Sequence, residues 1–410
     1  MNRRLPGIAL VANAVLAPSS LYLLASTVVA ITSRRPGTHR LANGQPQPAG
    51  PASTRFVVVV PAHNEESTIG AMLASMSAQR YPSNRFSVHV VADNCTDRTA
   101  DVVRDAGHTV HERTDAEHPG KGPALNWLLQ ALVRDSTHFD VAVFVDADTV
   151  VDADFLRVME LRFVDGAVAV QGFYGVLGAF ASTPATLRYC ALAARHHLRP
   201  IARTTFGGSC GLFGNGMAFR RDLIVGREWT DHLVEDMQFQ LELLHAGVRV
   251  QYEPLAQVEA EMPHTFANSV TQHQRWERGR FSLISTHVPR LARQVVTGPT
   301  RRAAADAIAD MAVPPLSMMG AATVAATGLG VLSSLRTRRV RLSAVLGVSM
   351  CATLAFHVLA ALRLVAAPRE AYRSLLHAPR LAAWKVKVLL GARTNGQWIR
   401  TARNAETIDQ

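Results

Sequence analysis

The pair Asp146 and Asp148 is the strongest chemical signal in the sequence. The two carboxylates stand two residues apart behind the apolar run 141–145, so on an extended chain both side chains point to the same side. A cation makes such crowding favourable, and Mg²⁺ or Mn²⁺ held by carboxylates and substrate phosphates would neutralise a departing phosphate group. We predict that Asp148 is the direct metal ligand, whereas Asp152 and Asp154 are interpreted as helix-start charges.

Two earlier β-type runs also end in polar residues. Glu65 follows the first run, and Asp93 closes the second. Ser67 and Asp97 are typical helix caps, but capping does not account for Glu65 and Asp93. In open α/β sheets, ligands bind beyond the carboxyl ends of the strands. We therefore predict that Glu65 and Asp93 contact a nucleotide.

Glycine-rich segments supply two further candidates. Lys121 follows the loop 118–120 and stands at the start of a helical segment, where a phosphate is favoured, although a plain loop is the alternative. Gly214 and Asn215 lie in the polar stretch 207–221, whose glycines would let the backbone approach a ligand. A β-hairpin with ordinary turns accounts for that stretch nearly as well.

Two helical segments carry the last candidates. Glu235 and Asp236 begin a helix, where a favourable interaction with the helix dipole accounts for them in isolation. Gln272, Arg275 and Trp276 are spaced i, i+3, i+4 and share one helix face. An aromatic ring beside a guanidinium and an amide can stack on a sugar and hold a diphosphate, and a solvated basic face is the alternative.

The elements that must position these residues alternate between strand and helix. Helices are expected after Ser67, after Asp97 and around 122–133, and strands at 56–62, 86–93 and 141–148. This alternation predicts an α/β domain with a mostly parallel sheet that helices cover on both faces.

Taken in order, the motifs resemble glycosyltransferase family 2, in particular its membrane-bound branch of cellulose, chitin and hyaluronan synthases. The resemblance covers about residues 55–290 and rests on Asp93, the DxD pair, the acidic pair at 235–236 and the QxxRW motif at 272–276. Val234 departs from the family pattern, which has Thr before the acidic pair. The resemblance implies a GT-A fold, with a Rossmann-like mixed sheet, and inverting transfer from a nucleoside diphosphate sugar, expected to be a UDP-sugar.

The resemblance also implies roles for the candidate residues. Asp236, beside Glu235, would be the catalytic base, and Asp148 would ligate the metal that bridges the diphosphate. The remaining residues would bind the substrates: Glu65, Asp93, Lys121 and Asp146 the nucleotide sugar, and Gly214, Asn215, Gln272, Arg275 and Trp276 the diphosphate and the acceptor.

Three long apolar stretches, at 7–32, 311–333 and 342–366, predict membrane segments. A cleaved signal peptide is the alternative for the first, and buried core helices for the others. The predicted organisation is an anchor at 1–35, a linker at 36–54, a GT-A domain at 55–305, two membrane segments at 306–368 and a basic cytoplasmic or interfacial tail at 369–410. The basic loop 336–341 would lie outside, against the positive-inside tendency, so a re-entrant segment is an alternative.

Charge and cysteine content indicate which partners and which cellular compartment to expect. The net charge of +11 comes from arginines gathered around the apolar stretches and in the last forty residues, which favours an anionic membrane surface over nucleic acid. The four cysteines are scattered singly, as expected for a domain that faces the reducing cytosol. We therefore expect a multi-pass cell-membrane protein with a cytoplasmic catalytic domain.

The leading functional hypothesis is extension of a polysaccharide at the cytoplasmic face, with partner subunits for export. Transfer of one sugar to a lipid-linked or short acceptor is the enzymatic alternative, because three spans are few for an unaided secretion channel. A catalytically silent, nucleotide-sugar-binding scaffold and a nucleotidyltransferase are the other readings.

Overall fold

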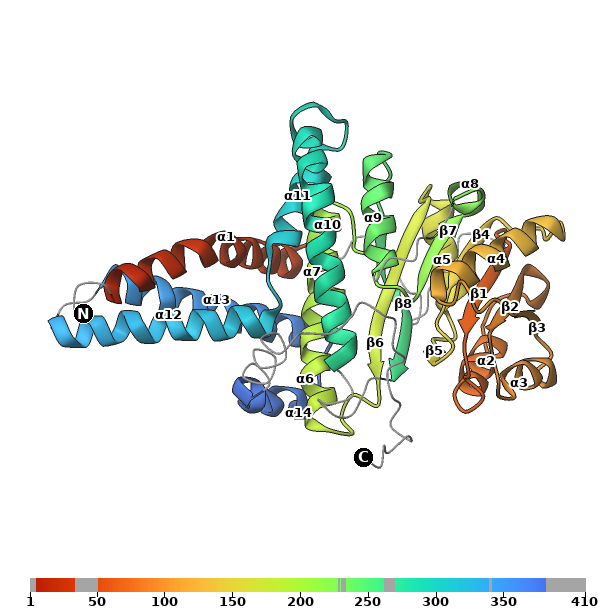
Figure 1. Cartoon of the computed structure of the whole chain (residues 1–410), viewed down its shortest axis with the longest axis horizontal. Helices are drawn as coiled ribbons and strands as arrows, with labels where there is room; N and C mark the ends of the chain where they lie inside the picture. The colour runs from red at the N-terminus through yellow and green to blue at the C-terminus, as the bar shows by residue number, and fades with distance from the viewer. Residues whose placement is uncertain are drawn as a thin grey trace.

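A mixed sheet and a bundle of long helices make up the molecule (Figure 1). The computed structural model describes residues 5–33, 51–227, 229, 234–261, 270–338 and 341–380, and for 5–6 and 270–278 it describes the backbone alone. Most of the predicted linker and of the basic tail lies outside these ranges.

The sheet has eight strands in the order β3-β2-β1-β4-β7-β6-β8-β5. The first four are parallel, as expected, but β7 runs antiparallel between β4 and β6, so the whole sheet is mixed. The strands are β1 (Phe56–Ala62), β2 (Phe86–Asp93), β3 (Thr109–Arg113), β4 (Val141–Phe144), β5 (Thr149–Val151), β6 (Ala169–Leu177), β7 (Met217–Arg220) and β8 (Gln251–Glu261).

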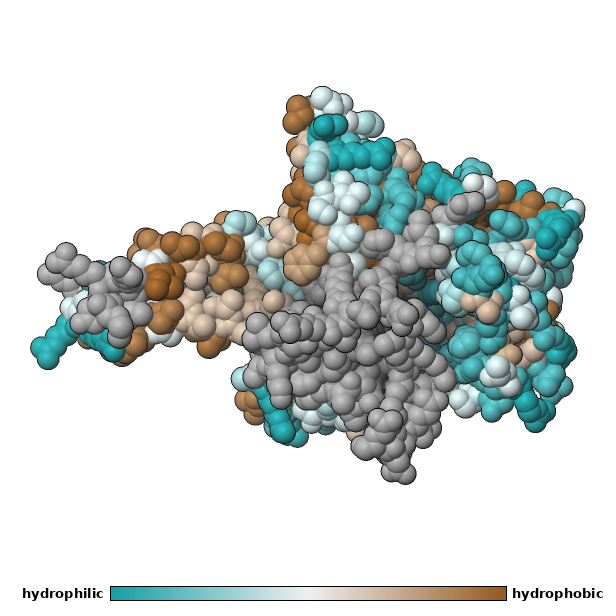
Figure 2. All heavy atoms as spheres, in the orientation of Figure 1, coloured by the Kyte–Doolittle hydropathy of each residue, from teal (hydrophilic) through white to brown (hydrophobic). Residues whose placement is uncertain are grey.

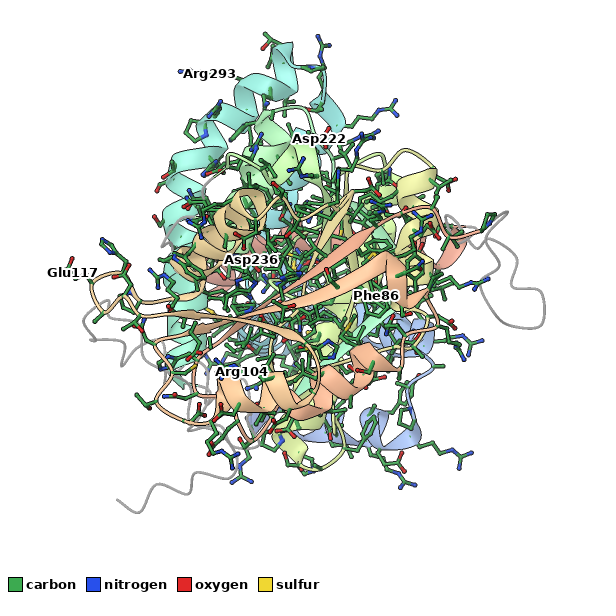
Figure 3. All side chains as sticks on the ribbon, turned by 90° about the vertical axis from the view of Figure 1, so that its right-hand side faces the viewer. Phe86, Arg104, Glu117, Asp222, Asp236 and Arg293 are labelled. Atoms are coloured by element: carbon green, nitrogen blue, oxygen red, sulfur yellow. The ribbon has the colours of Figure 1, made fainter. Side chains whose placement is uncertain are left out.

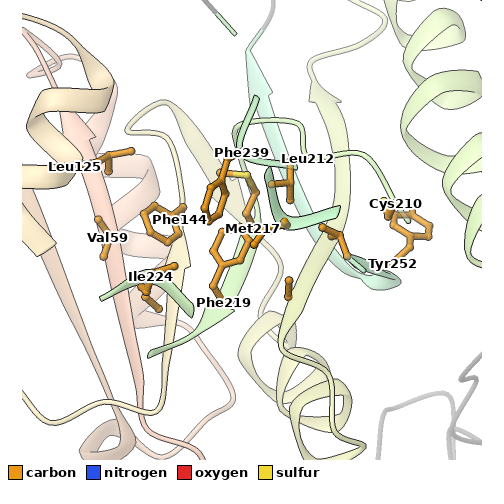
Figure 4. Close-up of a cluster of buried hydrophobic side chains, with 14 of the residues drawn as sticks. Val59, Leu125, Phe144, Cys210, Leu212, Met217, Phe219, Ile224, Phe239 and Tyr252 are labelled. Atoms are coloured by element: carbon orange, nitrogen blue, oxygen red, sulfur yellow. The ribbon is translucent and has the colours of Figure 1, made fainter. Parts of the chain in front are cut away.

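Helices cover both faces of the sheet because successive side chains of a strand point to opposite sides. On β1, Val57 and Val59 pack into a core that includes α4 (Lys121–Arg134), whereas Val58 and Val60 pack into a second core with α2 and α5. Figure 4 shows part of the first core, where Phe144 and Phe219 of neighbouring strands meet edge to face. The other helices of this part are α2 (Ile69–Ser77), α3 (Thr99–Asp105), α5 (Phe155–Val164), α6 (Thr183–Leu192), the π-helix η2 (Ala193–Leu198), α7 (Arg199–Thr205), α8 (Arg221–Ile224), α9 (Glu235–His245), α10 (Val270–Thr297) and α11 (Arg301–Ala312), together with the 3₁₀ turn η1 (Ser83–Arg85).

Three helices are long and apolar enough to cross a membrane: α1 (Leu5–Thr32), α12 (Leu316–Thr337) and α13 (Leu342–Leu364). They extend together from the sheet domain, and their outer surface is apolar where that of the sheet domain is largely hydrophilic (Figures 1 and 2). Small residues let the helices approach closely, since a Cβ added at Gly330 of α12 would stand 2.8 Å from the Ala344 nitrogen of α13. The predicted second stretch began at 311, but residues 311–312 end α11 because two prolines interrupt the helix before α12.

Ion pairs join α7 to α11, and a hydrogen bond joins α11 to α1 of the bundle. Arg203 of α7 donates to Asp306 of α11 at 2.8 Å and to Asp310 at 3.2 Å, and Arg199 also pairs with Asp310. The Tyr22 hydroxyl of α1 donates to Asp306 at 2.9 Å. After α13 the chain returns to the sheet domain in α14 (Arg369–Ser374) and the 3₁₀ turn η4 (Leu375–His377), where Ala371 is fully buried.

Candidate functional site

The loops that follow β1 and β2 meet at the carboxyl edge of the parallel strands. The Asn64 side-chain oxygen accepts from the Thr96 amide at 2.8 Å, and the Glu65 amide donates to the Thr99 hydroxyl at 2.7 Å. Glu65 is half-buried, and its carboxylate accepts from the Thr68 hydroxyl at 2.7 Å. These contacts explain how Glu65 is held, and its predicted role as a nucleotide contact stays a prediction.

Asp97 lies just before the N-cap residue of α3, Arg98. Its carboxylate accepts from the Thr99 amide at 3.0 Å in the first turn of α3 and from the Glu66 amide at 3.1 Å. Burial opposes ionisation, but these hydrogen bonds outweigh it and lower the pKa of Asp97. Asp97 therefore joins the β1 and β2 loops.

Asp93 is buried against a cation that sequence reasoning missed. Arg113 lies opposite Asp93 in the parallel register of β2 and β3, and its guanidinium donates to the Asp93 carboxylate at 2.5 Å. Arg113 also donates to Asp115 at 2.7 Å. A charged residue at the end of a third parallel strand was the available signal. Arg113 thus fixes the orientation of Asp93 and ties the loop after β3 to it.

The segment that holds Asp146 and Asp148 is a turn, so the expectation of an extended chain was wrong. Strand β4 ends at Phe144, and the Thr149 amide donates back to the Asp146 carbonyl at 3.2 Å. The two carboxylates are nevertheless half-exposed on either side of the buried Ala147. The tight turn thus keeps both carboxylates accessible.

Asn215 stabilises this turn through two side-chain hydrogen bonds. Its side chain is fully buried, its oxygen accepts from the Asp146 amide at 3.2 Å, and its amide donates to the Thr149 hydroxyl at 2.8 Å. Sequence reasoning assigned Asn215 to acceptor binding, but its polar atoms face the turn, so a positioning role is the one that its contacts support.

Lys121 connects the turn to the neighbouring loop. It is the first residue of α4, and its ammonium donates to Asp146 at 2.5 Å and to the Gly214 carbonyl at 2.8 Å. Burial by itself would lower the pKa of Lys121, but Asp146, Glu235 and Asp236 together raise it above the ordinary value. Lys121 is therefore a charged ammonium surrounded by carboxylates.

Asp236 in the first turn of α9 lies close to the same lysine. A Cβ added at Gly214 would stand 3.4 Å from the Asp236 carboxylate and 3.7 Å from the Lys121 ammonium. Gly214 has φ +78°, a conformation that glycine adopts without strain. In Figure 3, Asp236 lies amid side chains in the middle of the view, whereas Glu117 and Arg293 project from its edge.

The surroundings of Asp236 raise its pKa above that of a carboxyl group in water. Burial, and then the negative charge of Glu235, raise the pKa of Asp236 from 3.8 to about 7. The Met237 amide, Lys121 and Arg195 act in the opposite direction. A carboxylate with a pKa near neutrality is suited to accept a proton in a general-base step.

The DxD turn fits a divalent cation that a substrate helps to bind. In the described part of the chain no group of three His, Cys, Asp or Glu residues could hold a metal alone. Mg²⁺ characteristically takes one or two carboxylates and completes its shell with water and phosphate oxygens, and carboxylate oxygens also suit Mn²⁺. Asp146 is paired with Lys121, so Asp148 is the carboxylate that we would assign to the ion.

Tyr174 is a second residue that sequence reasoning missed at this turn. Burial, and then the charges of Asp146 and Asp148, raise the pKa of its hydroxyl well above the ordinary value. Tyr174 lies on β6, far from the turn in sequence, and no local pattern marks it. It therefore stays neutral beside both carboxylates.

The QxxRW residues lie on a helix, as predicted, because α10 spans Val270–Thr297. The side chains of Gln272, Arg275 and Trp276 lie outside the described residues, so their contacts stay a prediction.

Comparison with known proteins places this chain in a family. The chain is 27% identical over 229 residues to the probable glycosyltransferase YdaM of Bacillus subtilis (strain 168), covering 54% of each chain. It is 26% identical over 238 residues to the poly-beta-1,6-N-acetyl-D-glucosamine synthase of Staphylococcus aureus (strain COL), covering 54% of this chain and 53% of that one. The chain thus spans about half the length of these relatives.

The fold has a counterpart among solved structures. A mannosyltransferase from Pyrobaculum calidifontis, solved with GDP-Man and Mn²⁺, superposes with a TM-score of 0.53 at 18% identity, covering 87% of this chain and 99% of that one. The fold is therefore of the GT-A type, with three helices that are long and apolar enough to span a membrane. The sequence model described as "Glycosyltransferase like family 2" matches residues 51–279, more than half of the chain. The chain therefore belongs to glycosyltransferase family 2.

Proposed function

We propose that this glycosyltransferase is a membrane-bound inverting enzyme that transfers a sugar from a nucleoside diphosphate sugar, expected to be a UDP-sugar, to an acceptor hydroxyl at the cytoplasmic face. The observation that carries the proposal is the position of Lys121 between two carboxylates of different function. It donates to Asp146 of the DxD turn and lies beside Asp236 across Gly214. A donor diphosphate and an acceptor hydroxyl would therefore meet next to one lysine.

The proposed step uses Asp236 as the base. The Asp236 carboxylate takes the proton from the acceptor hydroxyl as that oxygen bonds to the anomeric carbon. The bond from this carbon to the diphosphate oxygen breaks on the opposite face, and the nucleoside diphosphate leaves with the electron pair. When bound at Asp148, Mg²⁺ or Mn²⁺ supplies positive charge that neutralises the leaving group.

The residues around the base set its pKa and position the groups that bind the donor. Burial and Glu235 raise the pKa of Asp236 and Lys121 limits the rise, so a large share of the carboxylate is ionised near neutral pH and is still basic enough to accept a proton. Arg113 holds Asp93 in place. Asp93 and Glu65 are the two residues that we propose to contact the nucleotide.

The bundle and the cysteines support a cytoplasmic orientation of the sheet domain. The sheet domain and α14 lie at the same end of the three membrane helices (Figure 1). All four cysteines, Cys95, Cys190, Cys210 and Cys351, are free thiols, which supports a reducing compartment. We therefore place the sheet domain in the cytoplasm.

Two classes of acceptor are candidates for this reaction. The similarity to a poly-beta-1,6-N-acetyl-D-glucosamine synthase supports extension of a polysaccharide. Export subunits are the partners that we propose for this product. A cavity of about 800 Å³ between the membrane helices and α9 favours the alternative, transfer to a lipid-linked acceptor. Incubation of membranes that hold the full-length enzyme with labelled UDP- and GDP-sugars and Mn²⁺, followed by sizing of the product, separates a polymer from a single sugar on a lipid.

Asp236→Asn tests the mechanism. General-base catalysis contributes about 10²–10⁴-fold, so we expect transfer to fall by this factor while UDP still binds. Asp222→Asn is the matched control, because Asp222 is an exposed carboxylate on α8. Undiminished turnover of Asp236→Asn would refute the assignment of the base.

A further inference from the structure

The cavity of about 800 Å³ lies where the membrane bundle meets the sheet domain. Its walls come from α12 and α13 on one side and from α6, η2, α7, α9 and α11 on the other. Its volume is near the upper end of the range of about 300–1,000 Å³ for sites that enclose small molecules. It is therefore large enough for part of a long-chain ligand.

One end of the cavity opens on the membrane-facing surface. Val324 of α12 and Leu359 of α13 line it, and they are 64% and 44% exposed on helices that are apolar enough to span a bilayer. Val324 is eight residues into α12, about 12 Å along the helix at about 1.5 Å per residue. A lipid chain could therefore enter sideways from the hydrocarbon layer.

The other end lies against the proposed catalytic residues. Phe213 lines the cavity and precedes Gly214, and Met237 lines it and follows Asp236. Arg195, an exposed residue of η2 in the cavity wall, interacts electrostatically with Asp236. The cavity thus runs from the membrane surface to the neighbourhood of the base.

Positive charge gathers in the wall of this otherwise apolar cavity. Five arginines and one acidic residue, Asp310, line it: Arg188, Arg195, Arg199, Arg203 and Arg280. Arg199 and Arg203 pair with Asp310, and Arg280 donates to the backbone carbonyls of Met311 and Val313. The wall keeps a clear excess of positive charge, and guanidinium groups suit phosphate because their donors match its oxygens.

We infer that the cavity binds the acceptor as a lipid, with the apolar chain along the wall that α12 and α13 form, a phosphate at the arginines and a headgroup hydroxyl beside Asp236. The inference rests on the proposed transfer reaction and names its acceptor class. A lipid chain gains little on leaving one apolar environment for another, so the phosphate contacts must supply most of the selectivity.

The test uses the full-length protein in nanodiscs of a phosphate-free galactolipid that contain a trace of phosphatidylglycerol with a photoreactive diazirine in its acyl chain. After irradiation, mass spectrometry of the peptides locates the crosslinks. We expect crosslinks in the cavity-lining parts of α12 and α13, and competition by unlabelled phosphatidylglycerol but not by a phosphate-free alkyl glucoside. Equal competition by the glucoside would overturn the inference.

Two pairs of variants sharpen this test. Ala321→Trp fills the cavity, whereas Ala322→Trp adds the same bulk at an exposed position of α12 outside the lining. We expect labelling to fall about tenfold in the first and to stay at the wild-type level in the second. Arg195→Gln should weaken competition by phosphatidylglycerol about tenfold, as for loss of a charge-assisted hydrogen bond. The exposed Arg290→Gln on α10 is its control.

Labelling and transfer separate the two proposals. Asp236→Asn should lose transfer and keep labelling. If it keeps both, the catalytic proposal fails while the lipid site stands. If Ala321→Trp is labelled like the wild type, or transfers sugar at the wild-type rate, the cavity is not the acceptor site even though the transfer reaction stands.

Discussion

The pH dependence of transfer should report the environment of Asp236. The base accepts a proton only when it is ionised, and its pKa is raised to about 7 by burial and by Glu235. Activity should therefore fall as the pH falls through 7, and kcat/KM at pH 6 should be about one tenth of its plateau. A surface aspartate with an ordinary pKa near 3.8 would leave activity unchanged over this range.

Glu235→Gln separates the effect of burial on the pKa of Asp236 from the effect of the neighbouring negative charge. Without the neighbouring charge the pKa of Asp236 falls, but burial, the larger cause, remains, so the acid limb should move to lower pH by on the order of one pH unit. The assay is the release of nucleoside diphosphate between pH 5 and 9 at saturating metal. Asp222→Asn on the exposed α8 should leave the profile in place. An acid limb that does not move in Glu235→Gln contradicts this account of the site.

The same pKa has a consequence for stability that needs no substrate. A carboxyl group whose pKa is higher in the folded state binds its proton more tightly there, so folding is opposed once the group ionises. The penalty is absent below pH 3.8, grows as the pH rises to about 7 and is then constant. The rise corresponds to up to about 4 kcal/mol, at about 1.36 kcal/mol per tenfold change. Asp236→Asn should therefore raise the Tm relative to wild type at pH 8 and not at pH 4.

Three further predictions concern the groups around the base and the membrane helices. Gly214→Ala should lose about 1–2 kcal/mol of stability, because its φ of +78° is strained with a side chain, and should lower kcat by crowding Asp236; thermal unfolding and initial rates measure both effects. Chelation by EDTA should abolish turnover, and Mn²⁺ should restore it in the wild type but not in Asp148→Ala; turnover that survives chelation contradicts the metal site. Gly330→Leu should lower the Tm in detergent because a Cβ there meets the Ala344 backbone at 2.8 Å, whereas Gly328→Leu, with open space around it, should not.

The parallel half of the sheet was predictable because its strands are apolar on both faces. The runs that became β1 and β2 were predicted to the residue, since Val57 to Val60 are all buried and polar residues follow each run directly. Strand β7 was not predicted, because its four residues lie within a glycine-rich stretch and pair with β4 and β6, which are remote in sequence. A strand of four residues is too short to show the alternation of apolar and polar residues that marks a β-strand in a sequence.

The candidate site was predictable where one strand end carries the signal and not where a partner comes from elsewhere. Asp93, Asp146 and Asp236 stand out in the sequence through local motifs. Arg113 meets Asp93 only because β3 pairs with β2 in parallel register, and Tyr174 comes from β6, which β7 separates from β4 in the sheet. The turn at Asp146 was misread as extended, since residue spacing does not reveal where a strand stops.

The contact between the Tyr22 hydroxyl and Asp306 limits how this enzyme can be shortened for laboratory use. A soluble fragment that starts after α1 would leave the acidic residues of α11 without this partner and would uncover the apolar sides of α12 and α13 that α1 shields. We expect such a fragment to aggregate. Preparations for crystallography or microscopy should therefore retain the first helix and a lipid-like solvent.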